Sequence, residues 1–132
     1  MKQKYGRRSK DDPKWQEVKD IVYKRDKCSC RLAKCLSMKE YFSLKKGFQQ
    51  NVDPAHIFSA SAEPSQIYNP KNIVCLTRFV HHRMDSYQSP LDGSDVDLNT
   101  HYYWWWRIYK SSIEDYDAER DYKQMLREEI FE

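Results

Sequence analysis

One stretch in the middle of the chain constrains the fold most, because apolar runs, turn formers and a helix signal follow one another in it. Residues 52–58 are a candidate strand, and Pro54 either weakens this strand or places it at a sheet edge. Residues 64–71 are rich in turn formers and predict a loop, and residues 72–76 are a second short apolar run. Thr77 can cap a helix that follows. A strand, a loop and a helix in this order can bring their side chains to one place.

The polar side chains of this stretch are of the types that bind metal ions and move protons. They are Asp53, His56, Asn72, His81, His82 and Asp85. His81 and Asp85 lie four residues apart, so they share one helix face, and an imidazole with a carboxylate is a plausible half of a divalent-metal site. A neutral His56 on the strand could take a proton from a nearby water. Asn72 could hydrogen-bond across the loop and hold the strand with its histidine.

The segment Ala55-His56-Ile57-Phe58-Ser59, followed by Asn72, Leu76 and His81-His82, resembles the HNH (ββα-metal) nuclease motif. The resemblance covers roughly residues 13–90 and implies a small ββα-metal core preceded by a helix. With the C-terminal helical extension, which is not part of the resemblance, the expected fold class is α+β. It implies that His56 is the general base, that Asn72 orients it and that His81 binds the metal. The residues around His56 and the later segment Trp104-Trp105-Trp106-Arg107 are most similar to those of bacteriophage-encoded members.

The chain departs from the family pattern at the position before the base. Members usually carry Asp, His or Glu there as a metal ligand, whereas this chain has Ala55, so another side chain must complete the ligand set. Asp85 is the first candidate, because it lies one helical turn after His81. Asp53 is the second, because it shares a strand face with position 55. His82 is the third, and it is also a candidate phosphate contact.

The cysteines depart from the family pattern as well. Many members bind a structural zinc with two Cys-x-x-Cys pairs, and the second pair should fall where Thr77 and Val80 stand. Zinc accepts four thiolates, so one alternative is a site made by all four cysteines. These are Cys28, Cys30, Cys35 and Cys75. The other alternative is that Cys75 is a small buried apolar residue.

The sequence predicts three parts: a basic arm over 1–12, a nuclease core over 13–90 and a helical extension over 91–132 packed on the core. Asp12 and Pro13 predict the start of a helix that ends near Arg25 or Asp26, with Trp15, Val18 and Val22 on its apolar face.

Further helices are predicted on either side of the motif. A short one over 37–46 is expected to end at Gly47, and 88–99 is expected to be a loop. The aromatic block from Tyr102 to Tyr109 predicts a helix whose tryptophans favour core packing over base stacking. A last helix is expected from about Asp117.

The charge is distributed unevenly along the chain. Residues 1–27 carry ten Lys or Arg and five Asp or Glu, whereas residues 111–132 carry three and eight. A basic arm is typical of phosphate binding, although a solvated terminus has the same composition. The candidate DNA contacts are Lys2, Lys4, Arg7, Arg8, Lys10 and Arg83. No apolar run of transmembrane length and no secretory signal are present, so the cytoplasm, of a host cell if a phage encodes the protein, is the expected compartment.

The function implied by the resemblance is metal-dependent hydrolysis of DNA phosphodiester bonds. Mg²⁺ is the expected ion, with Mn²⁺, Ni²⁺ or Zn²⁺ as alternatives. Two other functions are compatible with the sequence. One is a degenerate HNH module that binds DNA, or a phage packaging or recombination partner, without cleavage. The other is a dimeric enzyme that resolves branched DNA.

Overall fold

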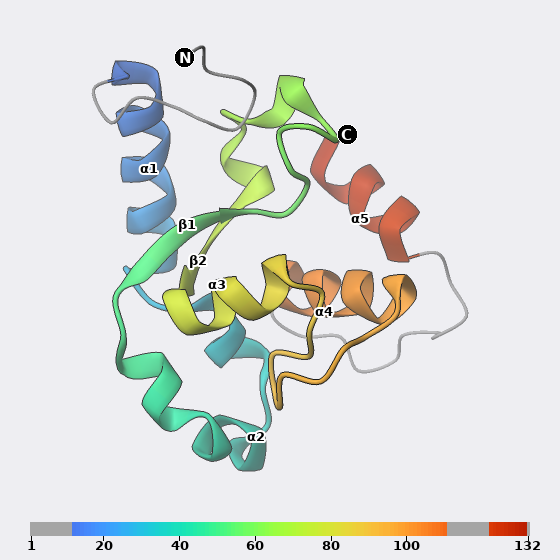
Figure 1. The fold of residues 1–132 in the computed structure, drawn as a ribbon. Coiled ribbons are helices and arrows are strands. Elements are labelled where there is room, and N and C mark those ends of the chain that lie inside the picture. Colours follow the sequence, from blue (N-terminus) through green and yellow to red (C-terminus); the bar gives the residue numbers. More distant parts are fainter. Residues whose placement is uncertain (1–11, 111–121, 132) are drawn as a thin grey trace, which may run out of the picture.

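A two-stranded antiparallel sheet lies between helices in the computed structural model, which describes residues 12–110 and 122–131 (Figure 1). The described elements, in chain order, are α1 (Pro13–Asp26), η1 (Arg31–Cys35), α2 (Met38–Ser43), η2 (Lys45–Gln49), β1 (Val52–His56), η3 (Pro64–Gln66), η4 (Pro70–Asn72), β2 (Ile73–Thr77), α3 (Arg78–Asp85), α4 (Leu98–Lys110) and α5 (Tyr122–Phe131). The α+β class is therefore confirmed, and two strands followed by a helix occur in the expected order.

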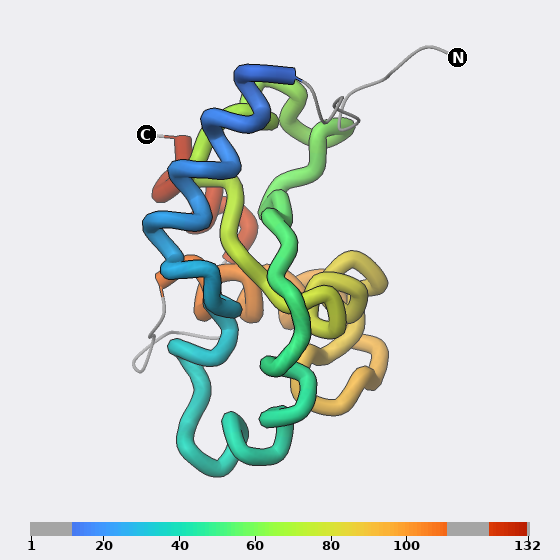
Figure 2. Tube along the Cα trace, turned by 90° about the vertical axis from the view of Figure 1, so that its left-hand side faces the viewer, coloured from blue at the N-terminus to red at the C-terminus, as the bar shows by residue number. Residues whose placement is uncertain are grey.

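The sheet separates two apolar clusters because side chains on a strand alternate between its faces. In β2, Ile73 and Cys75 pack with α1, while Val74 and Leu76 belong to the larger cluster on the other face. All five residues of β2 are buried. In β1, Ala55 belongs to the larger cluster. Figures 1 and 2 show α1 on one side of the strands and α4 on the other, so both faces of the sheet are covered.

Helix α1 begins and ends as the sequence predicts. The Asp12 side chain accepts a hydrogen bond from the backbone N–H of Lys14, and Pro13 is the first helical residue. Trp15, Val18 and Val22 are buried against the sheet. The helix ends at Asp26, and the next residue closes it in the left-handed conformation with φ 56°.

Asp26 joins α1 to the sheet and to η1. Its carboxylate is 1% exposed and accepts hydrogen bonds from Arg25 Nε at 2.8 Å, Arg31 Nη1 at 2.8 Å and the backbone N–H of Cys75 at 2.9 Å. Burial raises the pKa of Asp26, but these hydrogen bonds outweigh it and hold the pKa below its ordinary value. An ionised carboxylate therefore anchors the end of α1 to the middle of β2.

The C-terminal helices complete the larger core cluster. Trp104, Trp105 and Trp106 are buried, so their predicted role in core packing is confirmed. Buried side chains of α4 and α5 pack in the same cluster as those of β2 and α3, so the described part of the extension contacts the predicted core. The expected start of the last helix near Asp117 lies outside the described residues. No described helix has the length and apolar character needed to cross a membrane.

Several predicted boundaries were wrong. Strand β1 ends at His56 rather than at residue 58, because the chain then turns and is held by Asn72. Gly47 does not end a helix, since α2 ends at Ser43 and Gly47 lies within η2. There, a Cβ atom would lie 2.7 Å from the Phe79 ring.

Two further corrections concern helix starts. Thr77 stands at the N-cap position of α3 without a side-chain cap hydrogen bond, and the Gln50 side chain accepts from the Phe79 N–H instead. Helix α4 begins at Leu98, inside the stretch expected to be a loop, and extends to Lys110.

Candidate functional site

Asn72 fixes the turn that follows β1. Its side chain is fully buried and accepts from the Phe58 N–H at 2.9 Å. The side-chain amide donates to Phe58 O at 3.0 Å and to Gln66 O at 3.2 Å, and the Asn72 carbonyl accepts from the Ile57 N–H at 2.8 Å. The expected hydrogen bonds across the loop are therefore confirmed. The Asn72 side chain therefore holds the backbone at Phe58, just after β1, and at Gln66, on the far side of the loop.

His56 is the last residue of β1, and it faces the α1 side of the sheet. Its ring stacks on Trp15 with centroids 5.7 Å apart and an interplanar angle of 17°. Its Nε2 lies 2.9 Å from the carbonyl oxygen of Ile67, which can only accept, so Nε2 carries a proton in this contact. In a neutral ring with that tautomer the basic lone pair is on Nδ1.

His81 lies between two carboxylates on the other face of the sheet. Its Nδ1 is 3.5 Å from Asp53 Oδ2, and its Nε2 is 3.3 Å from Asp85 Oδ2. Asp53 also pairs with the exposed Arg78 at 3.2 Å. A neutral imidazole has one N–H, so it donates to one carboxylate and turns a lone pair toward the other. The structure therefore brings both candidate carboxylates to His81.

The donor chemistry of His81 and Asp85 fits a small divalent cation. Ligands in adjacent octahedral positions of Mg²⁺, each at about 2.0–2.1 Å, are about 3 Å apart. The 3.3 Å between Nε2 and Asp85 Oδ2 is close to that separation. The two carboxylates contact opposite nitrogens of one ring, however. Over residues 12–110 and 122–131, no three His, Cys, Asp or Glu side chains are grouped so as to hold a metal ion.

A cavity of about 230 Å³ lies at the end of β1, and we call it the groove. Its lining includes His56, Phe58, Asp85, Tyr87, His101 and Tyr102. The proposed base and one proposed metal ligand therefore line the same groove. Ala55 is 1% exposed in the larger core cluster, so a carboxylate at that position would be buried among apolar side chains. The surroundings of Ala55 are therefore unfavourable for the ligand that the family usually carries there.

The sequence did not predict that His101 lines the groove. It is 4% exposed, and its Nε2 accepts a hydrogen bond from Trp105 Nε1 at 3.2 Å. Burial lowers its pKa to about 4, so the ring is neutral at physiological pH. Only the tertiary fold brings α4 to the end of β1, so no local sequence signal identifies this residue.

The other candidate contacts lie on the outside of α3. His82 is exposed. Arg83 donates from Nη1 to Pro90 O at 3.1 Å, and its guanidinium lies 4.2 Å from the Phe79 ring centroid. Arg83 therefore supports the loop after α3. The candidate contacts of the arm (Lys2, Lys4, Arg7, Arg8 and Lys10) lie outside the described residues.

The four cysteines are described and none forms a disulfide. Cys28 is exposed, whereas Cys30 and Cys35 lie in the larger core cluster and Cys75 lies on the α1 side of the sheet. Burial raises the pKa of Cys35 to about 11 and that of Cys75 to about 12, so both are thiols at neutral pH. Their surroundings are those of core residues, and the zinc site stays a prediction.

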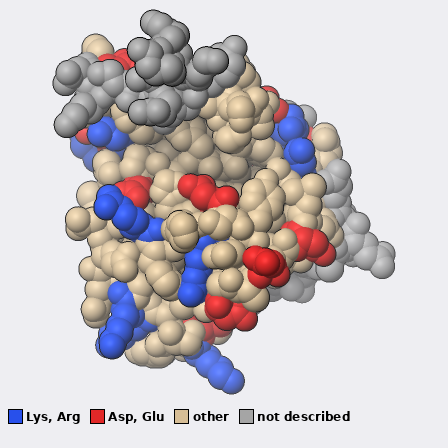
Figure 3. Space-filling model, in the orientation of Figure 1, with Lys and Arg blue, Asp and Glu red and all other residues tan. Residues whose placement is uncertain are grey.

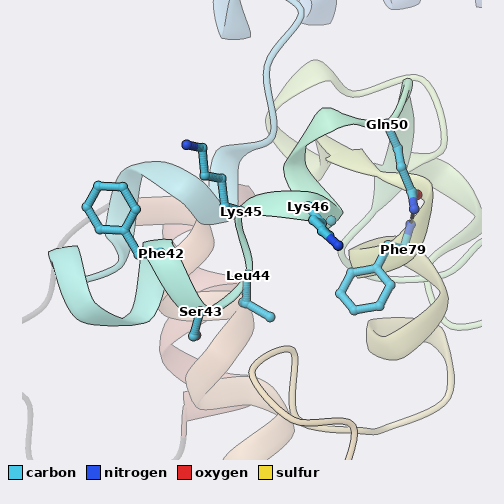
Figure 4. A pocket seen from close by; sticks show the side chains of 8 residues that line it. Phe42, Ser43, Leu44, Lys45, Lys46, Gln50 and Phe79 are labelled. Atoms are coloured by element: carbon cyan, nitrogen blue, oxygen red, sulfur yellow. Dashed lines mark hydrogen bonds between the residues drawn. The ribbon is translucent and has the colours of Figure 1, made fainter.

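The charged side chains on the face shown in Figure 3 are mixed. Lys and Arg lie beside Asp and Glu over this face, and no continuous basic surface covers its described part. A second cavity, of about 570 Å³, lies between η2 and the start of α3. Figure 4 shows Phe42 and Phe79 at its opposite ends, with Lys45 and Lys46 between them.

Comparisons with family models, with curated proteins and with solved structures gave no match to this chain.

Proposed function

We propose that the protein is a metal-dependent HNH-type endonuclease that hydrolyses DNA phosphodiester bonds. The observation that carries this proposal is the groove, which His56 and Asp85 line together while Asp85 contacts His81. The order β1, β2, α3 and the hydrogen bonds of Asn72 support it, because they match what the motif resemblance requires of these residues.

In this proposal His56 is the general base. The contact of Nε2 with Ile67 O orients the ring, and Nδ1 takes a proton from the attacking water. The water oxygen forms a bond to phosphorus, and the bond from phosphorus to the 3′ oxygen breaks in line with it. The 3′ oxygen takes up a proton from solvent. The products carry 5′-phosphate and 3′-hydroxyl ends.

His81 and Asp85 are the residues proposed to hold a divalent ion, with Asp53 on the other side of the imidazole. A bound ion supplies positive charge that stabilises the negative charge developing on the phosphate. Mg²⁺ is the first choice for a site containing carboxylates, and Mn²⁺ or Ni²⁺ also suit the imidazole. Asn72 is a positioning residue, because it acts on His56 through the backbone that it holds at Phe58 and at Gln66, next to the Ile67 carbonyl.

The test is cleavage of supercoiled plasmid with Mg²⁺ and with EDTA, using the wild type and His56→Ala. Loss of a general base slows a reaction by roughly 10²–10⁴-fold. We expect that loss while binding of the same DNA, measured in EDTA, stays within about twofold. Asp95→Ala is the matched control, since Asp95 is exposed and has no role in the proposed site. Nicking by His56→Ala at the wild-type rate would show that His56 is not the base.

A specific observation favours the non-cleaving alternative as the second candidate. Both carboxylates contact nitrogens of one ring, and the described side chains offer no group of three ligands. A wild type that binds plasmid and single-stranded DNA but cleaves neither with Mg²⁺, Mn²⁺ or Ni²⁺ would establish a binding module. Preferred cleavage of a four-way junction over linear duplex would instead support a branched-DNA enzyme.

A further inference from the structure

Tyr87 occupies a backbone conformation that favours glycine. Helix α3 ends in a Schellman motif, in which the Tyr87 N–H donates to Met84 O at 3.2 Å and the Gln88 N–H to Arg83 O at 2.9 Å. Tyr87 has φ 55°, in the left-handed region where a Cβ atom is unfavourable. Glycine at this position would make the folded protein more stable than tyrosine does. The presence of an aromatic ring here therefore needs a reason other than the backbone conformation.

The ring of Tyr87 forms part of the groove wall. It stacks on His101 with centroids 3.7 Å apart and an interplanar angle of 13°. Tyr102 lies edge-on to the same imidazole at 5.1 Å. We call these three side chains the aromatic wall. Tyr87 is 42% exposed and lines the groove, while His101 covers one face of its ring.

His101 gives a second, independent sign that this wall is not arranged for stability alone. Its Nε2 accepts from Trp105, so the proton of the neutral ring is on Nδ1. That buried Nδ1 has no hydrogen-bond partner among the described residues. Buried polar groups are nearly always paired, and exceptions often accompany functional sites. Two unfavourable features therefore meet on the wall of the groove that contains His56 and Asp85.

We propose that the aromatic wall binds one unstacked nucleobase of the DNA strand whose phosphodiester lies beside His56. This inference rests on the proposed nuclease function. A flat, exposed and uncharged ring is the surface on which bases stack without sequence preference. The carboxylate of Asp85 in the same groove repels a second phosphate but not a neutral base. The groove has a volume of about 230 Å³, which leaves room for a single base.

The wall therefore assigns a substrate class: single-stranded DNA, or duplex with a flap, bulge or junction that leaves a base unpaired. A base held on Tyr87 would fix the neighbouring phosphate in the groove. Fully paired duplex would have to lose the stacking of one base before it could bind in this way.

The experiment measures binding separately from cleavage. A fluorescently labelled single-stranded oligonucleotide and the same strand with abasic sites are titrated in EDTA, with fluorescence anisotropy as the readout. Stacking of one base on an aromatic ring corresponds to about 5-fold to 150-fold in affinity. We expect the wild type and Tyr87→Phe to bind the abasic strand more weakly by a factor in that range. We expect Tyr87→Gly to bind both strands equally.

Lys27→Gly is the matched control, because Lys27 also has a positive φ, 56°, and does not line the groove. It should keep the wild-type difference between the two strands. Urea unfolding checks that each variant is folded, and Tyr87→Asn, which tolerates the left-handed conformation, replaces Tyr87→Gly if that variant does not fold. Equal binding of both strands by the wild type, or an unchanged difference in Tyr87→Gly, would overturn the inference. Cleavage of the intact single strand by the same wild type, measured with Mg²⁺ and with EDTA, tests the nuclease function separately.

Discussion

Replacing Asn72 with alanine should destabilise the fold and impair the site at once. Alanine removes three side-chain hydrogen bonds and leaves the Phe58 N–H, Phe58 O and Gln66 O without these partners. Each such hydrogen bond contributes about 0.5–1.5 kcal/mol to stability, and a buried group left unpaired costs about 1–3 kcal/mol. Water that enters the space left by the side chain can pair with these groups and reduce that cost. We therefore expect about 3–5 kcal/mol less free energy of unfolding, a large part of the roughly 5–15 kcal/mol typical of a domain.

Urea unfolding followed by tryptophan fluorescence measures this loss. For a slope of about 1–3 kcal/mol per molar urea, the midpoint should fall by roughly 2 M. Asn69→Ala is the matched control, because its side chain bonds within the same loop while partly exposed, and it should cost about 1 kcal/mol. Asn72→Asp keeps an acceptor for the Phe58 N–H but places a carboxylate next to two carbonyl oxygens, which repel it. Protonation of the new carboxyl at low pH should therefore restore part of the lost stability. An Asn72→Ala midpoint equal to that of the control would refute this account of the turn.

Two further substitutions separate the scaffold from the site. Asp26→Asn should cost about 3–5 kcal/mol at neutral pH, because it breaks a buried network with two arginines. The pKa of Asp26 in the folded state lies below its ordinary value of 3.8, so the stability that the ionised carboxylate contributes is complete above pH 3.8 and is lost as the pH falls through the lower pKa. Urea unfolding at a series of pH values should show this loss in the wild type and not in Asp26→Asn. Asp85→Asn should change the free energy of unfolding by less than about 1 kcal/mol, because the Asp85 side chain is 63% exposed. The same substitution should abolish Mg²⁺ binding measured by calorimetry and should abolish nicking, whereas the control Asp95→Asn should change neither. Mg²⁺ binding and nicking at the wild-type level would show that Asp85 has no role in the proposed site.

The sequence predicted those elements whose signals are local. The cap at Asp12, the proline after it and the apolar face of α1 are all within one helix, and the helix formed where expected. The alternation of β1 and the spacing of His81 and Asp85 likewise predicted which side chains share a face. Such patterns depend on backbone periodicity, so neighbouring elements need not be known.

Features that depend on tertiary contacts were missed or misplaced. Gly47 was expected to end a helix, but its lack of a side chain instead admits the Phe79 ring of α3. His101 joined the groove only because α4 packs beside the end of β1. Asp26 was predicted as the end of a helix, whereas its main role is to bind a β2 amide 49 positions later in the chain. None of these partners lies near in sequence.

The strand geometry explains why the proposed chemistry is confined to one end of β1. His56 and Asp53 are three residues apart, so they face opposite sides of the sheet: His56 contacts Trp15 of α1, and Asp53 contacts His81 of α3. A base and a metal placed mid-strand on these faces would be separated by the backbone. At His56, however, the strand ends, and Asn72 holds the turn that follows. The groove at this end is lined from β1, α3 and α4 together, so a phosphodiester there is accessible to His56 and to Asp85. In the proposed mechanism, the position of His56 at the last residue of the strand places it in the same groove as Asp85, and the hydrogen bonds of Asn72 hold the turn that follows.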